Sequence, residues 1–285
     1  MSNGTEKKRI EIQTHYTNAL QHGSCCGPSA PAGVLAETAG YTAEDLKAIA
    51  DGTKVTSFGC GNPLAFAGVR EGDVVLDLGS GAGFDLLIAA QKVGRTGSVI
   101  GIDMTDAMLD RARANIRAAG LETVVEVRKG VIEELPVESA SVDWVISNCV
   151  INLSPEKPRV FAEIARVLKP GGRISISDIV VQDLPDWVRE NAALYSSCVG
   201  GAISEEEYLA GLRNSGLADV SVTERLVYDV GTLVGLVESE LPQAQAAASC
   251  GCGCGGSGLP KEQLAQVAKE MKGKIWSAKF TGRKP

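Results

Sequence analysis

The chain has 285 residues, and 28 Lys and Arg against 35 Asp and Glu give it a formal net charge of −7 at pH 7. Hydrophobic residues make up 44% of the chain, enough for a sizeable core, which excludes a mostly disordered or fibrous protein. An acidic chain without a stripe of Lys and Arg binds nucleic acid poorly, because that affinity comes mainly from neutralising phosphates. We therefore expect no nucleic-acid partner.

The sequence shows no sign of a membrane or secreted protein. No apolar run approaches the roughly 20 residues that span a bilayer, so we expect no membrane partner. Residues 1–16 contain several charged side chains and no continuous apolar segment, which argues against a secretory signal. The expected location is cytoplasmic, where the eight cysteines stay reduced and serve metal binding or chemistry rather than a disulfide framework.

The first unit, residues 1–70, is expected to contain helices and cysteine-bearing loops. Residues 6–20 predict a charged helix, and residues 42–52 predict a shorter one that begins with a capping pattern. The loops after these helices carry Cys25, Cys26 and Cys60 among Gly and Pro residues that exclude regular structure.

Residues 71–180 predict a doubly wound, mostly parallel α/β sheet, because short apolar runs alternate with amphipathic helices. The third helix is expected to have Ser154 as its N-cap and Pro155 at its first position, and to end at Lys169–Gly172. The expected strands are 74–78, 98–102, 124–127, 142–147 and 174–179, and the first two helices are 84–92 and 106–119.

The last third predicts a smaller C-terminal α+β unit. Ser204 and Glu207 form a capping box that opens a helix ended by Gly216, and residues 220–227 and 274–281 alternate like strands. The expected divisions are a region at 181–243, a flexible Gly/Cys-rich linker at 244–259, and a helix with a strand at 260–285.

A glycine-rich loop follows the first predicted strand and indicates a nucleotide-type cofactor. Glycines at alternate positions let backbone N–H groups approach a ligand at the start of a helix. A dinucleotide fingerprint requires Gly or Ala at position 84, and Phe84 therefore disfavours a nicotinamide cofactor. Asp103 ends the second strand, 26 residues after Asp77, where a carboxylate can accept hydrogen bonds from two ribose hydroxyls.

This loop resembles the first motif of the class I S-adenosylmethionine methyltransferases. In such enzymes the loop lies beside the amino-acid end of the cofactor, and residues after the third strand cover the adenine. Asp77 could equally be a buried acid satisfied by loop N–H groups, and Val131 and Ile132 could equally be core residues. The cofactor-binding residues that the resemblance implies in this region are Asp77, Gly79, Ser80, Gly81, Gly83, Asp103, Met104, Val131 and Ile132.

Three cysteines lie in positions that suit chemistry. Cys149 follows the fourth strand, at the carboxyl edge where open parallel sheets bind ligands, although an apolar setting also suits a cysteine that only fills a core. Cys60 and Cys198 lie among small residues that would let a bulky ligand approach.

Five motifs, taken together, resemble the arsenite S-adenosylmethionine methyltransferases. They are Gly59–Pro63, Val75–Gly81, Gly101–Thr105, Ser147–Leu153 and Cys198–Ala202, and the similarity extends from about Tyr16 to Leu226. The resemblance implies a Rossmann-like enzyme of arsenic detoxification that transfers methyl groups from S-adenosylmethionine to trivalent arsenic. Arsenite or methylarsenite would enter as thiol complexes, and residues 181–243 would belong to the arsenic-binding region.

The family pattern implies that Cys60, Cys149 and Cys198 bind the arsenic, which is a soft centre that prefers thiolates. The methylated product is formally pentavalent and must be reduced. The pattern therefore implies a disulfide between Cys60 and either Cys25 or Cys26, which an external thiol reductant such as thioredoxin or glutathione would reset.

Two further residues have open roles. Tyr16 matches a family tyrosine near the cofactor, but it could be an ordinary aromatic residue on a helix face. Asn148 orients the cofactor or caps the strand.

The tail departs from the family pattern. Cys250, Cys252 and Cys254 are too closely spaced for a zinc knuckle, so they belong either to a flexible linker or to a segment that captures arsenite for the site. Two other functions remain open for the whole chain. One is a methyltransferase for a carbon or oxygen atom of a small organic molecule, and the other is a protein that sequesters soft metals.

Overall fold

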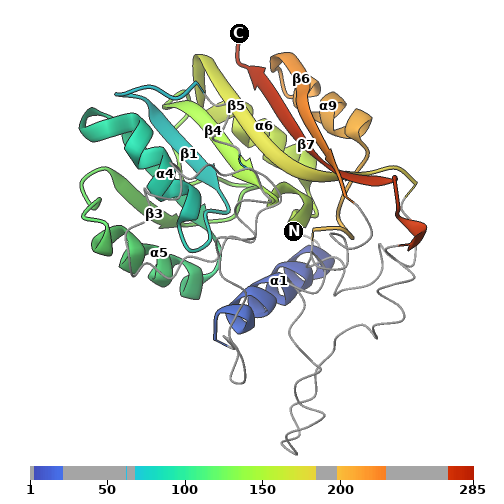
Figure 1. Ribbon diagram of the computed structural model, residues 1–285, viewed down its shortest axis with the longest axis horizontal. Coiled ribbons are helices and arrows are strands. Elements are labelled where there is room, and N and C mark those ends of the chain that lie inside the picture. The colour runs from blue at the N-terminus through green and yellow to red at the C-terminus, as the bar shows by residue number, and fades with distance from the viewer. Residues whose placement is uncertain (1–2, 22–61, 63–67, 184–197, 229–268) are drawn as a thin grey trace, which may run out of the picture.

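The computed structural model describes residues 3–21, 62, 68–183, 198–228 and 269–285. These residues build a seven-stranded sheet in the order β3-β2-β1-β4-β5-β7-β6 (Figure 1). Strands β1 to β5 run parallel, and β7 is antiparallel to both β5 and β6. The strands are β1 (Val74–Leu78), β2 (Ser98–Asp103), β3 (Val125–Lys129), β4 (Val142–Asn148), β5 (Leu168–Val181), β6 (Ala218–Val227) and β7 (Ile275–Arg283). The predicted mostly parallel, Rossmann-like sheet is confirmed.

Helices cover both faces of this sheet (Figure 1). Successive residues of β1 point to opposite faces, so Val75 packs in the core under α4 and Leu76 in the core under α6 and α9. The helices are α1 (Asn3–Gln21), α4 (Phe84–Val93), α5 (Asp106–Ala118), α6 (Lys157–Val167) and α9 (Glu205–Asn214), with short 3₁₀ turns at Gly94–Thr96 and Ile151–Leu153.

The start of α6 differs from the sequence prediction. The helix begins at Lys157 with Glu156 as its N-cap, two residues later than Ser154 and Pro155 suggest. The Ser154 hydroxyl instead donates to Glu133 Oε1 at 2.5 Å, because the preceding 3₁₀ turn places it beside the connection between β3 and β4.

The start of β5 also differs. The predicted loop at 169–172 lies within β5, which follows α6 directly. Gly171 N donates to Lys284 O at 2.9 Å, and Lys284 N donates to Gly172 O at 2.8 Å. The segment is held in extended form by pairing with the end of the chain, which its local sequence does not reveal.

The C-terminal elements join the same sheet rather than forming a second one. The Ser204–Glu207 capping box opens α9 as predicted, and β6 follows the helix. β7 then lies between β5 and β6, with Phe280 opposite Ile176 on one side and Val222 on the other. The predicted helix at 42–52 and the linker at 244–259 lie outside the described residues.

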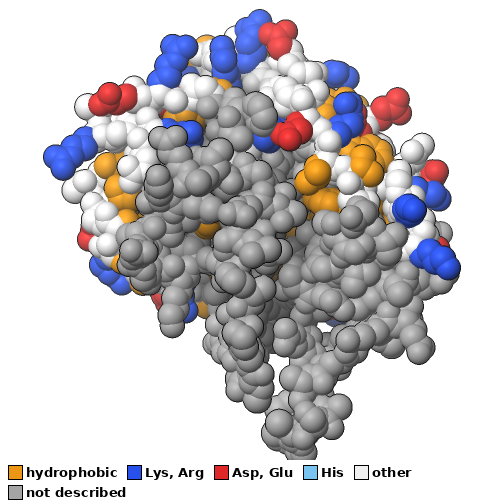
Figure 2. Space-filling view, in the orientation of Figure 1, with side chains coloured by type: hydrophobic (Ala, Val, Ile, Leu, Met, Phe, Trp, Pro, Cys, Tyr) orange, Lys and Arg blue, Asp and Glu red, His pale blue; other side chains and the backbone are white. Residues whose placement is uncertain are grey.

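The described surface is mixed in charge. Figure 2 shows Lys and Arg side chains around the rim of one face, with Asp and Glu side chains between them. Within the described part of the chain, none of the helices has both the length and the apolar character needed to cross a bilayer.

Candidate active site

The glycine loop lies at the carboxyl end of β1, and its backbone shape requires glycine. Gly79 and Gly81 have φ angles of +64° and +51°, in the left-handed region that residues with a Cβ rarely adopt. A Cβ on Gly79 would also lie 2.3 Å from Val150 Cγ2. Asn115 Nδ2 donates to Ala82 O at 2.9 Å and fixes the far side of the loop. The loop is therefore a rigid, close-approach surface.

Asp103 ties this loop to the end of β2. Gly81 N donates to Asp103 Oδ2 at 3.0 Å, and Thr105 N donates to Asp103 Oδ1 at 2.8 Å. Burial raises the pKa of Asp103, and the backbone N–H groups partly oppose this effect. Asp103 lines the pocket at the end of β2, and its role as an acceptor for ribose hydroxyls stays a prediction.

Two more carboxyl groups lie beneath the loop. Asp77 is only 2% exposed, and Asp85 is buried at the start of α4. Burial, and then the charges of Asp85 and Asp103, raise the pKa of Asp77 well above its usual range. A ligand with cationic groups would relieve this repulsion, and S-adenosylmethionine carries both an ammonium and a sulfonium group. These clustered carboxyl groups therefore suit the cationic groups of this cofactor.

A pocket opens above the loop, with about 1000 Å³ of empty space including its opening to solvent. Ile132 lines the pocket and also belongs to the core, so its position is compatible with both proposed roles. Asp77 and Gly83 lie outside the lining, Asp77 beneath the loop and Gly83 as the N-cap of α4. The predicted residues that line it are Tyr16, Gly79, Ser80, Gly81, Asp103, Met104, Val131, Ile132, Asn148 and Cys149.

Helix α1 forms a wall of this pocket, of which the sequence indicated only Tyr16. Arg9 and Ile12 line the pocket beside Tyr16. Gln13 Nε2 donates to Met104 O at 3.0 Å and fastens the helix to the end of β2. Met108, at the start of α5, completes the apolar side of the cavity.

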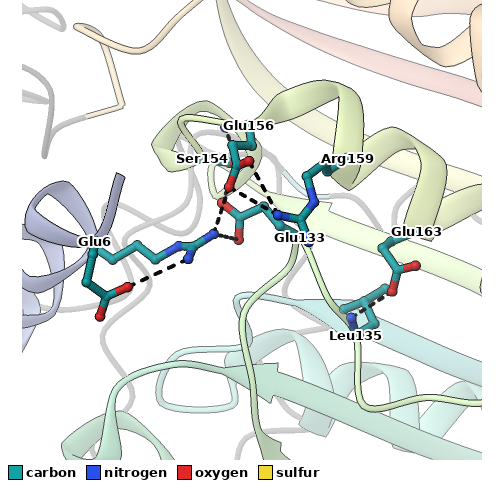
Figure 3. Close-up of polar contacts among 8 residues, drawn as sticks. Glu6, Glu133, Leu135, Ser154, Glu156, Arg159 and Glu163 are labelled. Carbon is teal, nitrogen blue, oxygen red and sulfur yellow. Dashed lines mark hydrogen bonds and ion pairs between the residues drawn. The ribbon is translucent and has the colours of Figure 1, made fainter. Parts of the chain in front are cut away.

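Arg9 fastens the same helix to the opposite side of the pocket. Its Nη2 atom lies 3.4 Å from Glu133 Oε2 and 3.2 Å from Glu156 Oε2. Figure 3 shows Glu133 and Glu156 close together and Glu6 apart from them at the left of the view. Arg9 Nη1 lies 3.9 Å from Glu6 Oε2. Arg9 and Glu156 are 147 residues apart, so spacing within the sequence contains no signal for this contact.

Cys149 and Cys198, 49 residues apart, are in direct contact. The Cys198 thiol donates to the carbonyl oxygen of Cys149 at 2.6 Å, and Cys149 N donates to Ser177 O at 2.9 Å. Both side chains are buried, and Cys149 also lines the pocket beside Asn148. Asn148 Nδ2 donates to Asp85 Oδ2 at 3.3 Å, which links the cysteine turn to the acidic cluster.

Only these two cysteines lie within the described residues. Cys149 is disulfide-bonded, whereas Cys198 carries a thiol. Arsenic binding by Cys149 would therefore require prior reduction. Cys25, Cys26, Cys60 and the tail cysteines Cys250, Cys252 and Cys254 lie outside the described residues, as does any pairing among them.

The sequence matches the methyltransferase-domain family over residues 70–216. The chain belongs to this methyltransferase family. The matched residues contain the glycine loop, Asp103 and both described cysteines, so most of the pocket lining lies within the methyltransferase domain, and α1 adds the remaining wall.

Several relatives of this methyltransferase are arsenite methyltransferases, and the predicted resemblance to them is confirmed. The protein of that name from Halobacterium salinarum is 47% identical over 204 residues, which are 71% of this chain and 51% of the relative. The human protein of that name is 32% identical over 206 residues, which are 69% of this chain and 54% of the relative. The chain thus spans about half the length of these two relatives.

A solved structure agrees with the sequence relatives. The arsenic(III) S-adenosylmethionine methyltransferase from Chlamydomonas reinhardtii superposes with a TM-score of 0.58 and 32% identity. The alignment covers 90% of this methyltransferase and 74% of the algal chain.

Proposed function

We propose that this protein is an arsenite methyltransferase that transfers methyl groups from S-adenosylmethionine to trivalent arsenic bound by cysteine thiolates. The observation that carries the proposal is the contact between Cys198 and Cys149 at the edge of the glycine-loop pocket. The sulfur of Cys198 thereby lies against the backbone of Cys149, so two residues that can supply soft ligands are neighbours beside the expected donor site, as a thiophilic substrate requires.

Residues in the pocket and beneath its loop would each bind a different part of the methyl donor. The acidic cluster around Asp77 favours its cationic end, Asp103 offers acceptors for the ribose hydroxyls, and Val131 with Ile132 offers an apolar surface for the adenine. When bound, S-adenosylmethionine supplies an electrophilic methyl group.

The cysteines hold the substrate. The thiolates of Cys149 and Cys198, with Cys60 as a third ligand, would fix the arsenic near this pocket, and bringing the reactants together supplies most of the rate gain. The arsenic lone pair is the nucleophile, so no side chain has to remove a proton from it.

A reductant completes the proposed cycle. Methylation takes two electrons of arsenic into the new bond, and the formally pentavalent product must regain two electrons before another turn. We propose that Cys60 with Cys25 or Cys26 provides these electrons and becomes a disulfide, which thioredoxin or glutathione then reduces. The disulfide at Cys149 supports this proposal, because Cys149 would have to be reduced before it could bind arsenic.

Product analysis tests the proposal. Reduced protein, arsenite, S-adenosylmethionine and a thiol should yield methylarsenicals by chromatography with mass detection, and Cys149→Ser and Cys198→Ser should lower the yield by at least about 100-fold. Full activity of both variants on a small organic acceptor would favour a carbon or oxygen methyltransferase. Absence of S-adenosylmethionine binding by calorimetry would favour a soft-metal-sequestering protein.

The tail cysteines provide a matched control and a separate test. Changing Cys250, Cys252 and Cys254 together to Ser should leave the rate at saturating arsenite unchanged. We propose that these thiols capture arsenite for the site, and the triple variant should then be slower only when arsenite is limiting. Equal rates of the triple variant and the wild type at limiting arsenite would show that the segment is only a linker.

A further inference from the structure

A buried polar cluster lies next to the Cys149 turn and outside the lining of the cofactor pocket. Its centre is Asp178, a fully buried residue of β5. Asn152 Nδ2 donates to Asp178 Oδ1 at 2.8 Å, and Tyr208 OH donates to Asp178 Oδ2 at 3.1 Å. The backbone N–H groups of Asn152 and Ile179 add bonds of 3.2 and 2.9 Å. None of these residues lines the pocket, so cofactor binding does not explain the cluster.

This cluster is connected to both cysteines. Ser177 precedes Asp178 in β5, and its carbonyl oxygen accepts the hydrogen bond from Cys149 N. Asn152 lies three residues after Cys149, in the 3₁₀ turn that follows β4. The Cys198 thiol then bonds to Cys149 O at 2.6 Å. A short chain of contacts therefore joins Asp178 to the sulfur of Cys198.

The backbone at the two cysteines needs such support. Cys149 and Cys198 have φ angles of +57° and +63°, in the left-handed region. This conformation is unfavourable for a residue with a Cβ, and a turn without a chemical task would favour Gly or Asn. Residues persist in such conformations when the surrounding structure over-determines them, and such positions cluster at functional sites.

Tyr208 is placed rigidly from α9. Its ring stacks on Phe280 of β7 with centroids 4.2 Å apart, and its edge meets Phe161 of α6 at 5.3 Å. Phenylalanine would serve that packing equally well, so the hydroxyl has a separate purpose. Burial, and then the charge of Asp178, raises the pKa of Tyr208 and keeps the phenol protonated as a donor.

The cluster also contains an unsatisfied acceptor. Asn152 is fully buried, and its Oδ1 atom has no hydrogen-bond partner within the described part of the protein. Leaving a buried polar atom unpaired is unfavourable for stability, and an apolar residue there would avoid the penalty. A polar cluster that is imperfect for stability is expected where it positions functional groups.

We propose that Asp178 and Tyr208 are positioning residues that hold Cys149 and Cys198 at the separation needed to bind one arsenic atom. The inference rests on the proposed function. Two thiolates gain affinity from sharing one arsenic only when both sulfurs can reach it without moving the backbone, and the Asp178 cluster fixes the two turns that carry them.

Tyr208→Phe is the sharpest test, because it removes only the hydroxyl and keeps the ring between Phe280 and Phe161. The variant is reduced with a phosphine, and sodium arsenite binding is measured by equilibrium dialysis with elemental detection. We expect its dissociation constant for arsenite to rise about tenfold, with that for S-adenosylmethionine changing less than about twofold. The KM for arsenite should rise by a similar factor, with a smaller effect on kcat.

Two further variants keep the result interpretable. Asp178→Asn keeps the size of the side chain but turns an NH₂ group toward groups that themselves donate hydrogen bonds. We expect the folded variant to bind arsenite more weakly, as Tyr208→Phe should. Ile164→Val, a buried truncation in α6, destabilises the same layer and should leave both dissociation constants unchanged.

The outcomes separate this inference from the proposed function. Wild-type arsenite affinity in Tyr208→Phe, alongside its loss in Cys149→Ser and Cys198→Ser, would overturn the positioning role and keep the proposed function. Equal weakening of arsenite and S-adenosylmethionine binding in Tyr208→Phe would show a merely structural hydroxyl and would also overturn it. Unchanged arsenite binding in both cysteine variants would overturn the two together.

Discussion

At the scale of single residues, Asp103 is the most constrained part of the pocket, because both of its oxygens accept backbone N–H groups. Asp103→Asn keeps the side-chain size but turns an NH₂ group toward one of those donors. We expect the dissociation constant for S-adenosylmethionine to rise about 10- to 100-fold, since hydrogen bonds to charged groups contribute about 1.5 to 3 kcal/mol. Titration calorimetry measures the change.

Asp106→Asn is the matched control for this substitution. Asp106 lies three residues further along the chain, and its carboxylate forms an exposed ion pair with Lys129. Exposed pairs of this kind contribute little to stability, so the control should bind S-adenosylmethionine like the wild type. Equal affinities for Asp103→Asn and the wild type would contradict the role assigned to Asp103.

Asp77 gives the cofactor pocket a pH dependence. Burial and the charges of Asp85 and Asp103 raise its pKa, so without ligand it keeps its proton to a higher pH than an exposed carboxyl. A nearby cationic ligand group favours the ionised form. Binding therefore releases a proton at pH values below the raised pKa. We expect affinity for S-adenosylmethionine to increase as the pH rises toward that value and to level off above it.

Calorimetry in two buffers of different ionisation enthalpy measures this proton release directly. The affinity of Asp77→Asn for S-adenosylmethionine should not depend on pH in this range, whereas Asp106→Asn should keep the pH dependence of the wild type. An affinity that falls as the pH rises would show that another group dominates the linkage.

The site residues that the sequence predicts share a property, which is that the signal for each of them lies within one short segment. The glycine loop and Asp103 follow their own strands, and Cys149 follows β4. Arg9 and Tyr208 gave no such signal, because their partners Glu156 and Asp178 lie 147 and 30 residues away. Their function exists only after the chain has folded.

At the scale of elements, the sequence predicted the bounds of a helix or strand best where its apolar pattern ended at a residue that terminates such an element. The bounds of β1 match the prediction, and those of α4 and α5 differ from it by one residue. The starts of α6 and β5 were wrong because side-chain and strand pairing with distant segments decided them. Boundaries set by tertiary contacts cannot be read from local pattern.

Helix α1 contributes to the pocket through its position in the fold, which its own sequence does not predict. Arg9→Met keeps the apolar stem of the side chain but removes the charge that meets Glu133 and Glu156. Glu133 is 5% exposed and would lose its cationic partner, so α1 should dock less firmly. We expect the dissociation rate of S-adenosylmethionine to rise at least about fivefold, which stopped-flow fluorescence measures.

Lys7→Met is the control on the same helix. The Lys7 side chain is 79% exposed, and it pairs only loosely with Glu11 at 3.9 Å. The substitution should leave the dissociation rate of S-adenosylmethionine unchanged. A rate for Arg9→Met equal to that of Lys7→Met would mean that the Arg9 contacts do not hold the pocket wall.

At the scale of the whole molecule, strand order was beyond sequence reasoning. The alternation of strands and helices indicated a parallel sheet, but nothing near residues 275–283 shows that β7 lies between β5 and β6. Two antiparallel registers place it there, with Phe280 beneath the Tyr208 ring. The last strand of the chain therefore supports the cluster behind the cysteines.

This placement makes Phe280 a test of how the C-terminal strand is coupled to the site. The side chain is fully buried, and Phe280→Ala should lower the free energy of unfolding by about 3 to 5 kcal/mol. Arg283→Ala, at the exposed end of the same strand, removes only a surface pair with Asp219 and should cost less than about 1 kcal/mol. Urea denaturation measures both changes, and S-adenosylmethionine affinity should persist in each variant that folds, because β7 does not line the pocket. A loss of stability in Phe280→Ala no larger than that in Arg283→Ala would show that β7 is an accessory strand and that the layer holding Tyr208 is stable without it.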